Sequence, residues 1–225
     1  MEYFGQAHQD KFVLNVLKEK RNGYFIEIGS NDAMHINNTY ILEKKFSWRG
    51  IMIEYEPQFL ASYKKYRTNS IHHIGDARDV DYRQLFESNN VPKVIDYLQI
   101  DLEVDNGSTL KTLQKIETLF DEYIFAVITF EHDIYHTNFN DTRLVSREIF
   151  KKAGYLCVFE DIANCNNPYE DWYVHPDLVD TECINKLIQN NINNYEPNDV
   201  TGKMLNWENI NYLYTSGKEY SENKV

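Results

Sequence analysis

Short runs of apolar residues recur along the chain, separated by polar or helix-patterned segments. The runs are rich in β-branched and aromatic residues, which is typical of buried strands. This pattern predicts strands at 24–28, 51–54, 70–77, 91–103, 122–133, 155–162 and 171–174. The first run ends at Gly29, where we expect a tight turn before the polar residues that follow.

Helical spacing of apolar residues marks most of the segments between these strands. An N-terminal amphipathic helix over 7–20 would place Phe12, Val13, Val16 and Leu17 on one face. Further helices are expected around 41–46 and over 59–67, 81–87, 107–120 and 141–152. Gly154 suits the C-terminal cap of the last of these.

Alternation of strands and helices predicts a doubly wound, mostly parallel sheet with helices on both faces. The loop between the last two strands is too short for a crossover helix, so 155–160 and 171–174 should pair as an antiparallel edge hairpin. We therefore expect a seven-stranded α/β fold in a single domain over 1–188. The Asn-rich remainder, 189–225, is expected to be a partly disordered C-terminal extension.

Composition and charge limit the classes of binding partner that we expect. The net charge of −12 disfavours nucleic acid and anionic lipid, which normally require clustered Lys and Arg. Three cysteines without metal-like spacing suggest a reducing compartment. The chain has no apolar run long enough to span a membrane and no signal-peptide pattern at its start, so a soluble cytoplasmic protein is expected.

Polar residues finish nearly every predicted strand. In a doubly wound sheet the carboxyl ends of parallel strands share one edge, and ligands bind there. The strand-end residues are Gly29, Glu54, Asp76, Asp101, Glu103, Glu131, His132 and Asp133. The candidate chemistry of the chain is therefore expected along this edge.

Several motifs, read in order, resemble the FkbM family of S-adenosylmethionine (AdoMet) methyltransferases. They are GYFIEIGSNDA, NNTYILEKKFSWRGIMIEYEP, YLQIDLEVDNGSTL, TFEHDIY and EDWYVHPDLV, within about 5–180. Ala33 and the run VDN at 104–106 depart from the pattern of that family. The resemblance implies a Rossmann-like class I methyltransferase fold and AdoMet as cofactor.

The resemblance also implies roles for the strand-end residues around AdoMet. Glu54 would accept hydrogen bonds from the ribose hydroxyls, since one carboxylate can accept both. Gly29 would let the backbone approach the cofactor, and Asp76 with Ala77 would meet the adenine amino group. The other candidate cofactor residues are Glu27, Ser30, Asp32, Asn38 and Asp101. Asn38 could instead cap the helix that follows.

Methyl transfer to an alcohol requires a base or a metal close to the sulfonium. His132 is the preferred base, because an imidazole titrates near neutral pH and two acids flank it in the sequence. Asp101 and Glu131 could assist in catalysis or hold Mg²⁺, which prefers oxygen ligands. Alternatively, these two carboxyl groups share a proton or orient the histidine.

Loops after the fifth and sixth strands should select the acceptor. The candidate substrate residues are Glu103, Asp133, Tyr135, His136, Asp171 and Trp172. Arg143 and Arg147 could hold an acidic group of the acceptor or simply pair with acids on their own helix.

The expected activity is methylation of a hydroxyl on a sugar, either in a glycan or in an activated sugar. Methylation of another small hydroxylated metabolite and a non-catalytic AdoMet-fold binding module are the alternatives. NAD chemistry is disfavoured, because no G-x-G-x-x-G follows the first strand. Nucleic acid is not expected as the acceptor, and the sequence does not indicate an oligomeric state.

Overall fold

The computed structural model describes residues 2–136, 140–164, 167–193, 206–207 and 212–213. The strands of the main sheet are β1 (Tyr24–Ile28), β2 (Arg49–Glu54), β3 (Ser70–Ile74), β4 (Val94–Ile100), β5 (Ile124–Glu131), β6 (Leu156–Asn164) and β7 (Asn167–Val174). The helices are α1 (Gln9–Val16), α2 (Tyr40–Phe46), α3 (Leu60–Tyr66), α4 (Tyr82–Ser88), α5 (Ser108–Glu117), α6 (Asn140–Lys152) and α7 (Thr181–Asn193), with a 3-10 turn at Pro57–Phe59.

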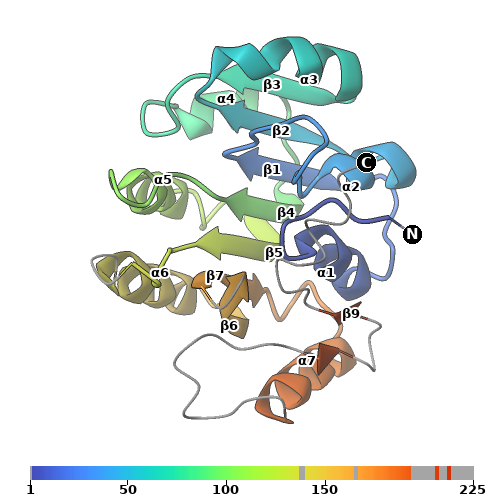
Figure 1. The fold of residues 1–225 in the computed structure, drawn as a ribbon, viewed down its shortest axis with the longest axis vertical. Coiled ribbons are helices and arrows are strands. Elements are labelled where there is room, and N and C mark those ends of the chain that lie inside the picture. Colours follow the sequence, from blue (N-terminus) through green and yellow to red (C-terminus); the bar gives the residue numbers. More distant parts are fainter. Residues whose placement is uncertain (1, 137–139, 165–166, 194–205, 208–211, 214–225) are drawn as a thin grey trace.

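The seven strands form one sheet in the order β3-β2-β1-β4-β5-β7-β6 (Figure 1). Strands β1 to β5 are parallel, and β7 runs antiparallel to both β5 and β6. The predicted doubly wound seven-stranded sheet and its antiparallel edge hairpin are therefore confirmed. Strand order reverses between β1 and β4, where the fold places its ligand crevice.

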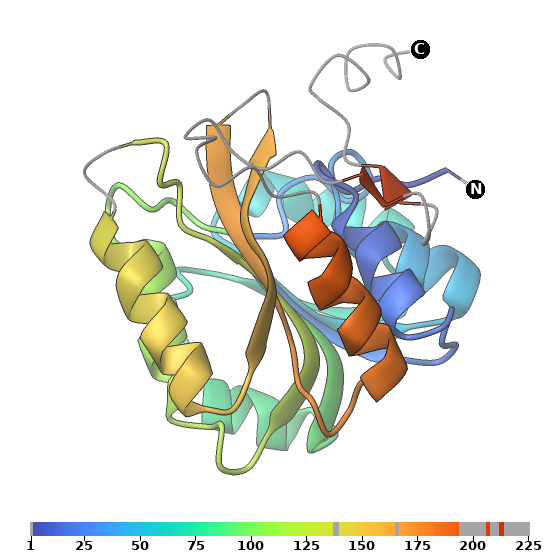
Figure 2. The same cartoon turned by 90° about the horizontal axis from the view of Figure 1, so that it is seen from below.

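Helices cover both faces of the sheet, so the molecule has three layers (Figure 2). One apolar cluster includes Phe12 of α1, Leu42 of α2 and Leu187 of α7. The second cluster, on the opposite face, includes Phe86 of α4 and Leu113 of α5. Successive strand residues alternate between the clusters, as the pleat requires.

Two helices differ from the expectation. The helix predicted over 7–20 spans only Gln9–Val16, because Lys18 and Glu19 have positive φ angles of 52° and 53° that a helix cannot continue through. Helix α7 is not among the elements that we predict, although its Ile184 and Leu187 have helical spacing, and both pack into the first cluster. This helix crosses position 188, which we expected to be the domain boundary.

Beyond α7 the structure describes only a two-stranded pairing of β8 (Asn206–Trp207) with β9 (Tyr212–Leu213). The other residues after 193, including the segment expected to be disordered, lie outside the described residues. Within the described part of the chain, no helix combines the length and apolar character that crossing a bilayer requires.

Candidate functional site

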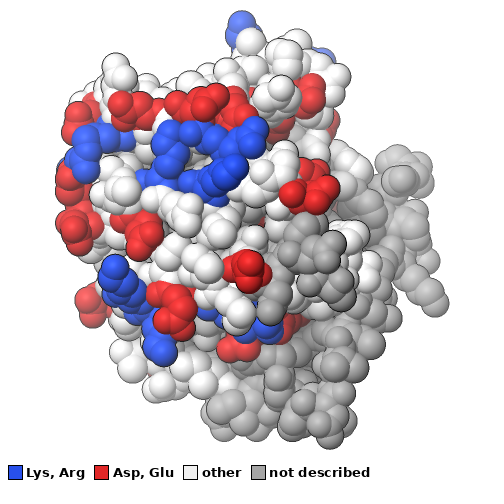
Figure 3. Space-filling view, turned by 90° about the vertical axis from the view of Figure 1, so that its left-hand side faces the viewer, with Lys and Arg blue, Asp and Glu red and all other residues white. Residues whose placement is uncertain are grey.

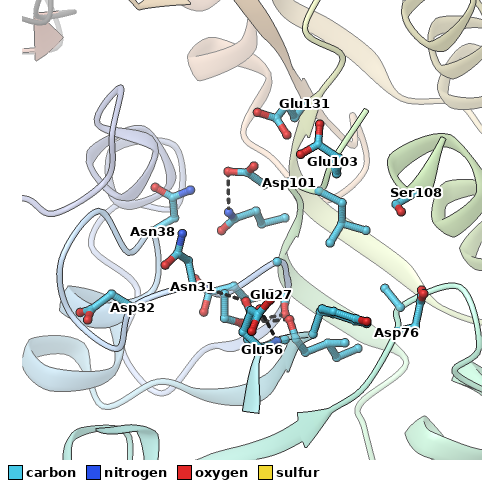
Figure 4. Close-up of a pocket in the computed structure, with 18 of the residues that line it drawn as sticks. Glu27, Asn31, Asp32, Asn38, Glu56, Asp76, Asp101, Glu103, Ser108 and Glu131 are labelled. Carbon is cyan, nitrogen blue, oxygen red and sulfur yellow. Dashed lines mark hydrogen bonds between the residues drawn. The ribbon is translucent and has the colours of Figure 1, made fainter. Parts of the chain in front are cut away.

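A pocket of about 730 Å³ opens at the carboxyl ends of β1 to β5. It lies at the reversal in strand order, where the sheet topology predicts a ligand. Cofactor candidates from the sequence that line it are Glu27, Gly29, Ser30, Asp32, Asn38, Glu54, Asp76, Ala77 and Asp101. Figure 4 shows Asp101, Glu103 and Glu131 gathered at one end of the pocket and Asp76 apart from them.

Gly29 ends β1 in a conformation that excludes a side chain. Its φ is +86°, and a Cβ atom there would lie 1.7 Å from the backbone carbonyl oxygen of Asp101. The glycine therefore allows β1 and the end of β4 to come together at the floor of the pocket. The lack of a side chain at Gly29 therefore serves the contact with the Asp101 backbone, and it would also let a cofactor come close to the turn.

Arg67 holds the loop after Gly29 in place. This residue is fully buried, and the sequence pattern does not single it out. Its guanidinium donates to Glu43 at 2.9 Å and to Asn37 at 2.8 Å, and lies 3.8 Å from Glu27. Asn37 in turn donates to the backbone carbonyl groups of Ser30 and Asp32. The pocket wall is thus held by a buried polar network.

Within this loop, Ser30 and Asp32 hydrogen-bond the local backbone. The Ser30 hydroxyl donates to the carbonyl oxygen of Glu27 at 3.2 Å. Asp32 accepts from the backbone N–H groups of Met34 and His35 at 2.9 and 2.8 Å. Both side chains shape the pocket wall while they line it.

Glu54 is positioned by two backbone N–H groups. One carboxylate oxygen accepts from Asn31 at 2.7 Å, and the other accepts from Glu56 at 2.9 Å. Each oxygen retains a further lone pair, so the carboxylate can accept two more hydrogen bonds from a ligand in the pocket. This is the geometry that a vicinal diol such as ribose requires.

Three buried side chains of the pocket each carry an oxygen atom without a hydrogen-bond partner. These atoms are Oε1 of Glu27, Oδ1 of Asn38 and Oε1 of Gln99. A buried acceptor without a partner costs about 1–3 kcal/mol unless a water molecule or a ligand donates to it. Thr39, and not Asn38, is the N-cap of α2, which leaves the Asn38 side chain for the pocket.

Burial raises the pKa of Glu27 to about 7, although Arg67 opposes the rise. Its orphaned oxygen would be paired by a cationic donor, which would also stabilise the ionised carboxylate. Asn38, which also lines the pocket, carries a second unpartnered acceptor atom.

At the other end of the pocket, the guanidinium of Arg78 binds the carboxylate of Asp76. The guanidinium donates to both carboxylate oxygens, with one contact at 2.6 Å, and these hydrogen bonds lower the pKa of Asp76 to about 2. The carbonyl oxygen of Ala77 accepts from the hydroxyl of Tyr82 at 2.9 Å. Both residues line the pocket, but Asp76 already has a cationic partner.

Carboxyl groups crowd the end of the pocket beyond β4 and β5. Asp101 and Glu131 share a side-chain hydrogen bond, and burial raises the pKa of both. Repulsion from Asp101 and Asp133 raises the pKa of Glu131 further. The pKa of Asp133 rises to about 6 through burial and the charge of Asp101. These groups hold at least one proton between them near neutral pH.

His132 does not face the pocket, and this corrects the assignment of the general base. Its side chain is fully buried, its Nδ1 accepts from the N–H of Ile134 at 3.2 Å, and its Nε2 lies 3.3 Å from Asp171. Glu131 and Asp133 line the pocket and the histidine between them does not; β5 ends at Glu131, and Asp133 has a positive φ of 48°. We therefore do not retain His132 as the base.

Two of the expected substrate residues are also part of the protein interior. Asp171 is fully buried and forms two hydrogen bonds with Arg147, at 2.6 and 2.8 Å. Burial alone would raise the pKa of Asp171, but His132 and Arg147 lower it well below its usual value. Trp172 stacks on Phe12 with ring centroids 4.5 Å apart. Neither residue lines the pocket, so neither contacts a substrate there.

The other substrate candidates divide into two groups. Glu103 and Asp133 line the pocket. Tyr135 and His136 follow on the same loop but do not line it, and their rings lie 4.3 Å apart. Arg143 and Arg147 pair with Asp161 on β6, at distances down to 2.5 and 3.0 Å, rather than with acids of their own helix or with a ligand.

The structure gives no support to Mg²⁺ at Asp101 and Glu131, because these two carboxyl groups belong to no group of three close ligand side chains among the described residues. Among the described residues, one group of three ligand side chains has its atoms within 4.8 Å of one another, namely His132, Asp161 and Asp171. Arg143 and Arg147 already bind its carboxylates. We derive no step through a metal.

Pocket residues that the sequence pattern did not single out include Gln6, Gln99 and Tyr55. Gln99 has a signal in the sequence, because it lies two residues before Asp101 on a strand and so shares its face. Gln6 comes from the segment before α1, and no local pattern links it to the strand ends.

The donor set fits AdoMet better than a dinucleotide. AdoMet has an ammonium and a sulfonium, which suit acids and orphaned acceptors, whereas a pyrophosphate requires cations or backbone N–H groups. Of the described residues that line the pocket, only Arg78 is a Lys or Arg, and Asp76 pairs with it.

No protein-family model and no curated protein sequence matches the chain, so the FkbM resemblance is not confirmed. Among solved structures, a candidate rRNA methylase from Clostridium thermocellum is 12% identical, with a TM-score of 0.50 over 77% of this chain and 99% of that one. A TehB-like AdoMet-dependent methyltransferase from Corynebacterium glutamicum is 11% identical, with a TM-score of 0.47 over 74% and 86%. Aeropyrum pernix fibrillarin, solved with AdoMet bound, is 11% identical, with a TM-score of 0.42 over 74% and 76%. The first of these likenesses and the strand order agree that the chain has the Rossmann-like fold of class I methyltransferases.

Proposed function

We propose that this protein is an AdoMet-dependent O-methyltransferase that acts on a hydroxyl of a sugar. The observation that carries the proposal is the pair of buried, unpartnered acceptor atoms on Glu27 and Asn38 in an acid-lined pocket at the switch point of the sheet. Such a site matches the positive charges of AdoMet. It does not match the pyrophosphate of NAD.

Different residues of the pocket would bind different parts of the cofactor. Glu27 and Asn38 would bind the methionine ammonium, and Glu54 would accept the ribose hydroxyls through its free lone pairs. Asp76 and Ala77 lie farther along the pocket, where the adenine would bind. The methyl group would then lie towards Asp101 and Glu131.

When bound, AdoMet supplies an electrophilic methyl group: the acceptor oxygen bonds to the methyl carbon, the carbon–sulfur bond breaks with its electrons remaining on sulfur, and the hydroxyl proton leaves. Asp101 and Glu131 are placed to receive that proton, since one member of the pair is ionised while the other is protonated. Their raised pKa values bring the base closer to neutral pH. The acids of this end would also attract the positively charged sulfonium and so help to hold the cofactor in the pocket.

Calorimetry with S-adenosylhomocysteine (AdoHcy) tests the cofactor assignment. We expect one site, and Glu54→Ala should weaken binding about 10- to 100-fold, because hydrogen bonds to charged groups contribute about 1.5–3 kcal/mol. Glu87→Ala, an exposed acid on α4, is the matched control and should bind normally. Folded wild-type protein that fails to bind AdoHcy would remove the proposal.

Transfer of a labelled methyl group to a panel of hexose and deoxyhexose glycosides tests the acceptor. Methylation of a hydroxyl in a simple glycoside is the expected result. Methylation confined to non-sugar alcohols would instead establish the alternative of another small metabolite. Repeating the assay with EDTA tests the Mg²⁺ expectation directly.

A further inference from the structure

The acceptor end of the pocket carries more negative charge than AdoMet can balance. Asp101, Glu103, Glu131 and Asp133 line it. The nearest Lys or Arg among the described lining residues is Arg78, which Asp76 already binds at 2.6 Å. The sulfonium contributes a single positive charge, and one shared proton on the Asp101 and Glu131 pair removes one more negative charge. An excess of carboxylate charge remains.

A second observation at the same place is independent of that charge. Gln99 is 3% exposed, and its amide nitrogen donates to Asp101 at 3.3 Å. Its side chain lines the pocket, and its amide oxygen has no hydrogen-bond partner among the described residues. An acceptor oxygen buried beside an acidic cluster requires an N–H or O–H donor from a ligand.

We propose that the acceptor is an amino sugar, whose protonated amine binds among Glu103, Glu131 and Asp133 while a neighbouring hydroxyl faces the Asp101 and Glu131 pair. The inference rests on the proposed methyl transfer and narrows its substrate class. An ammonium group supplies both the positive charge that the carboxylates lack and the donors that Gln99 and the acids can accept. It would also favour ionisation of Asp133, whose pKa is raised to about 6 by burial and by the charge of Asp101.

The same charge disfavours phosphate-bearing acceptors, including nucleotide-linked sugars. Basic side chains gather elsewhere: the groove between α4 and α5 is lined by Arg78, Arg83, Lys111 and Lys115, and Figure 3 shows Lys and Arg around a hollow on that side of the molecule. None of the four acids of the acceptor end lines this groove. A phosphate at the acceptor end would face carboxylates without a free cation nearby.

The test compares acceptor binding to the AdoHcy complex of the full chain at pH 7. The probes are methyl glycosides of 2-, 3- and 4-amino-deoxyglucose, each with its N-acetyl form, the parent methyl glucoside and glucose 1-phosphate. At least one amino glycoside should bind tenfold or more tightly than its N-acetyl form and the parent, and the phosphate should bind weakest. Asp133→Asn and Glu103→Gln should each reduce that ratio towards one, whereas Glu87→Gln should leave it unchanged.

The outcomes separate this inference from the proposed function. If AdoHcy binds but every amino glycoside binds no better than its N-acetyl form, or does not bind, the amino sugar assignment is wrong and the methyltransferase proposal stands. If AdoHcy itself does not bind, both are wrong. Thermal melting of each variant identifies loss of folding, and the N-acetyl comparison on wild-type protein does not depend on any variant.

Discussion

Glu27 on β1 and Gln99 on β4 are paired in register, and each has one buried oxygen without a partner. Register partners on adjacent parallel strands point to the same face, and both side chains line the pocket. The pairing therefore places the cofactor ammonium, which we assign to Glu27, beside the acceptor amine, which we assign to Gln99.

The pH dependence of cofactor binding should report on Glu27. Burial raises its pKa in the free protein to about 7, so the carboxylate that attracts an ammonium is mostly neutral at pH 6 and mostly ionised at pH 8. Wild-type affinity for AdoHcy should therefore rise between pH 6 and 8. Glu27→Gln should bind more weakly at pH 8 and lose most of that rise in calorimetry. An unchanged slope in the variant would show that another group is responsible.

Glu170 on β7 should make stability depend on pH. It is 2% exposed and accepts from Gln9 at 2.8 Å, and burial raises its pKa from 4.5 to about 8. The folded state therefore keeps a proton that the unfolded state loses between about pH 4.5 and 8, so the free energy of unfolding falls as pH rises through that range.

Glu170→Gln removes this ionisation. It should be more stable than wild type at pH 8, on the order of 1–4 kcal/mol, and close to wild type at pH 5. Urea unfolding at both pH values measures the difference. A variant whose stability relative to wild type is the same at pH 5 and pH 8 would contradict the raised pKa.

How much of this the sequence could predict depends on whether the signal is local. Short apolar runs predict the strands, and the residues that end these runs predict the acids at the strand ends. The structure has both. The two acids that flank His132 line the pocket while the histidine does not, and this depends on the positive φ of 48° at Asp133, just after the end of β5, which no sequence pattern predicts.

Other features have no local signal. Arg67 holds the cofactor loop through Glu43 and Asn37, residues 24 and 30 positions away in the sequence, so only the fold brings them together. The same holds for Gln6, which enters the pocket from before α1. Helix α7 does have a local signal in the spacing of Ile184, Leu187 and Ile188, but it continues past 189 into the Asn-rich region that we expected to be an extension.

Substitutions of the pocket acids and of His132 should have different effects on activity and stability. Glu131→Gln and Asp101→Asn should lower kcat about 10²- to 10⁴-fold, the usual contribution of a positioned base. His132→Gln, outside the pocket, should mainly lower thermal stability, because it perturbs the buried contact with Asp171. Methyl-transfer kinetics beside melting curves test this. A stable His132→Gln protein that binds AdoHcy but loses as much activity as Glu131→Gln would restore the histidine as the base.

Gly29 and Gly154 have almost the same φ angle, so substitutions at these two positions distinguish the cost of a steric clash from the cost of the left-handed conformation. Gly29 and Gly154 have φ values of +86° and +87°, but a Cβ atom at Gly29 would lie 1.7 Å from a carbonyl oxygen, whereas one at Gly154 would meet nothing within 4 Å. Gly154→Ala should therefore cost about 1–2 kcal/mol, the penalty of a left-handed residue. Gly29→Ala should cost about 3 kcal/mol or more, because the chain must also move to relieve the clash. Urea unfolding measures both, and equal losses would show that β1 and β4 separate freely at the pocket floor.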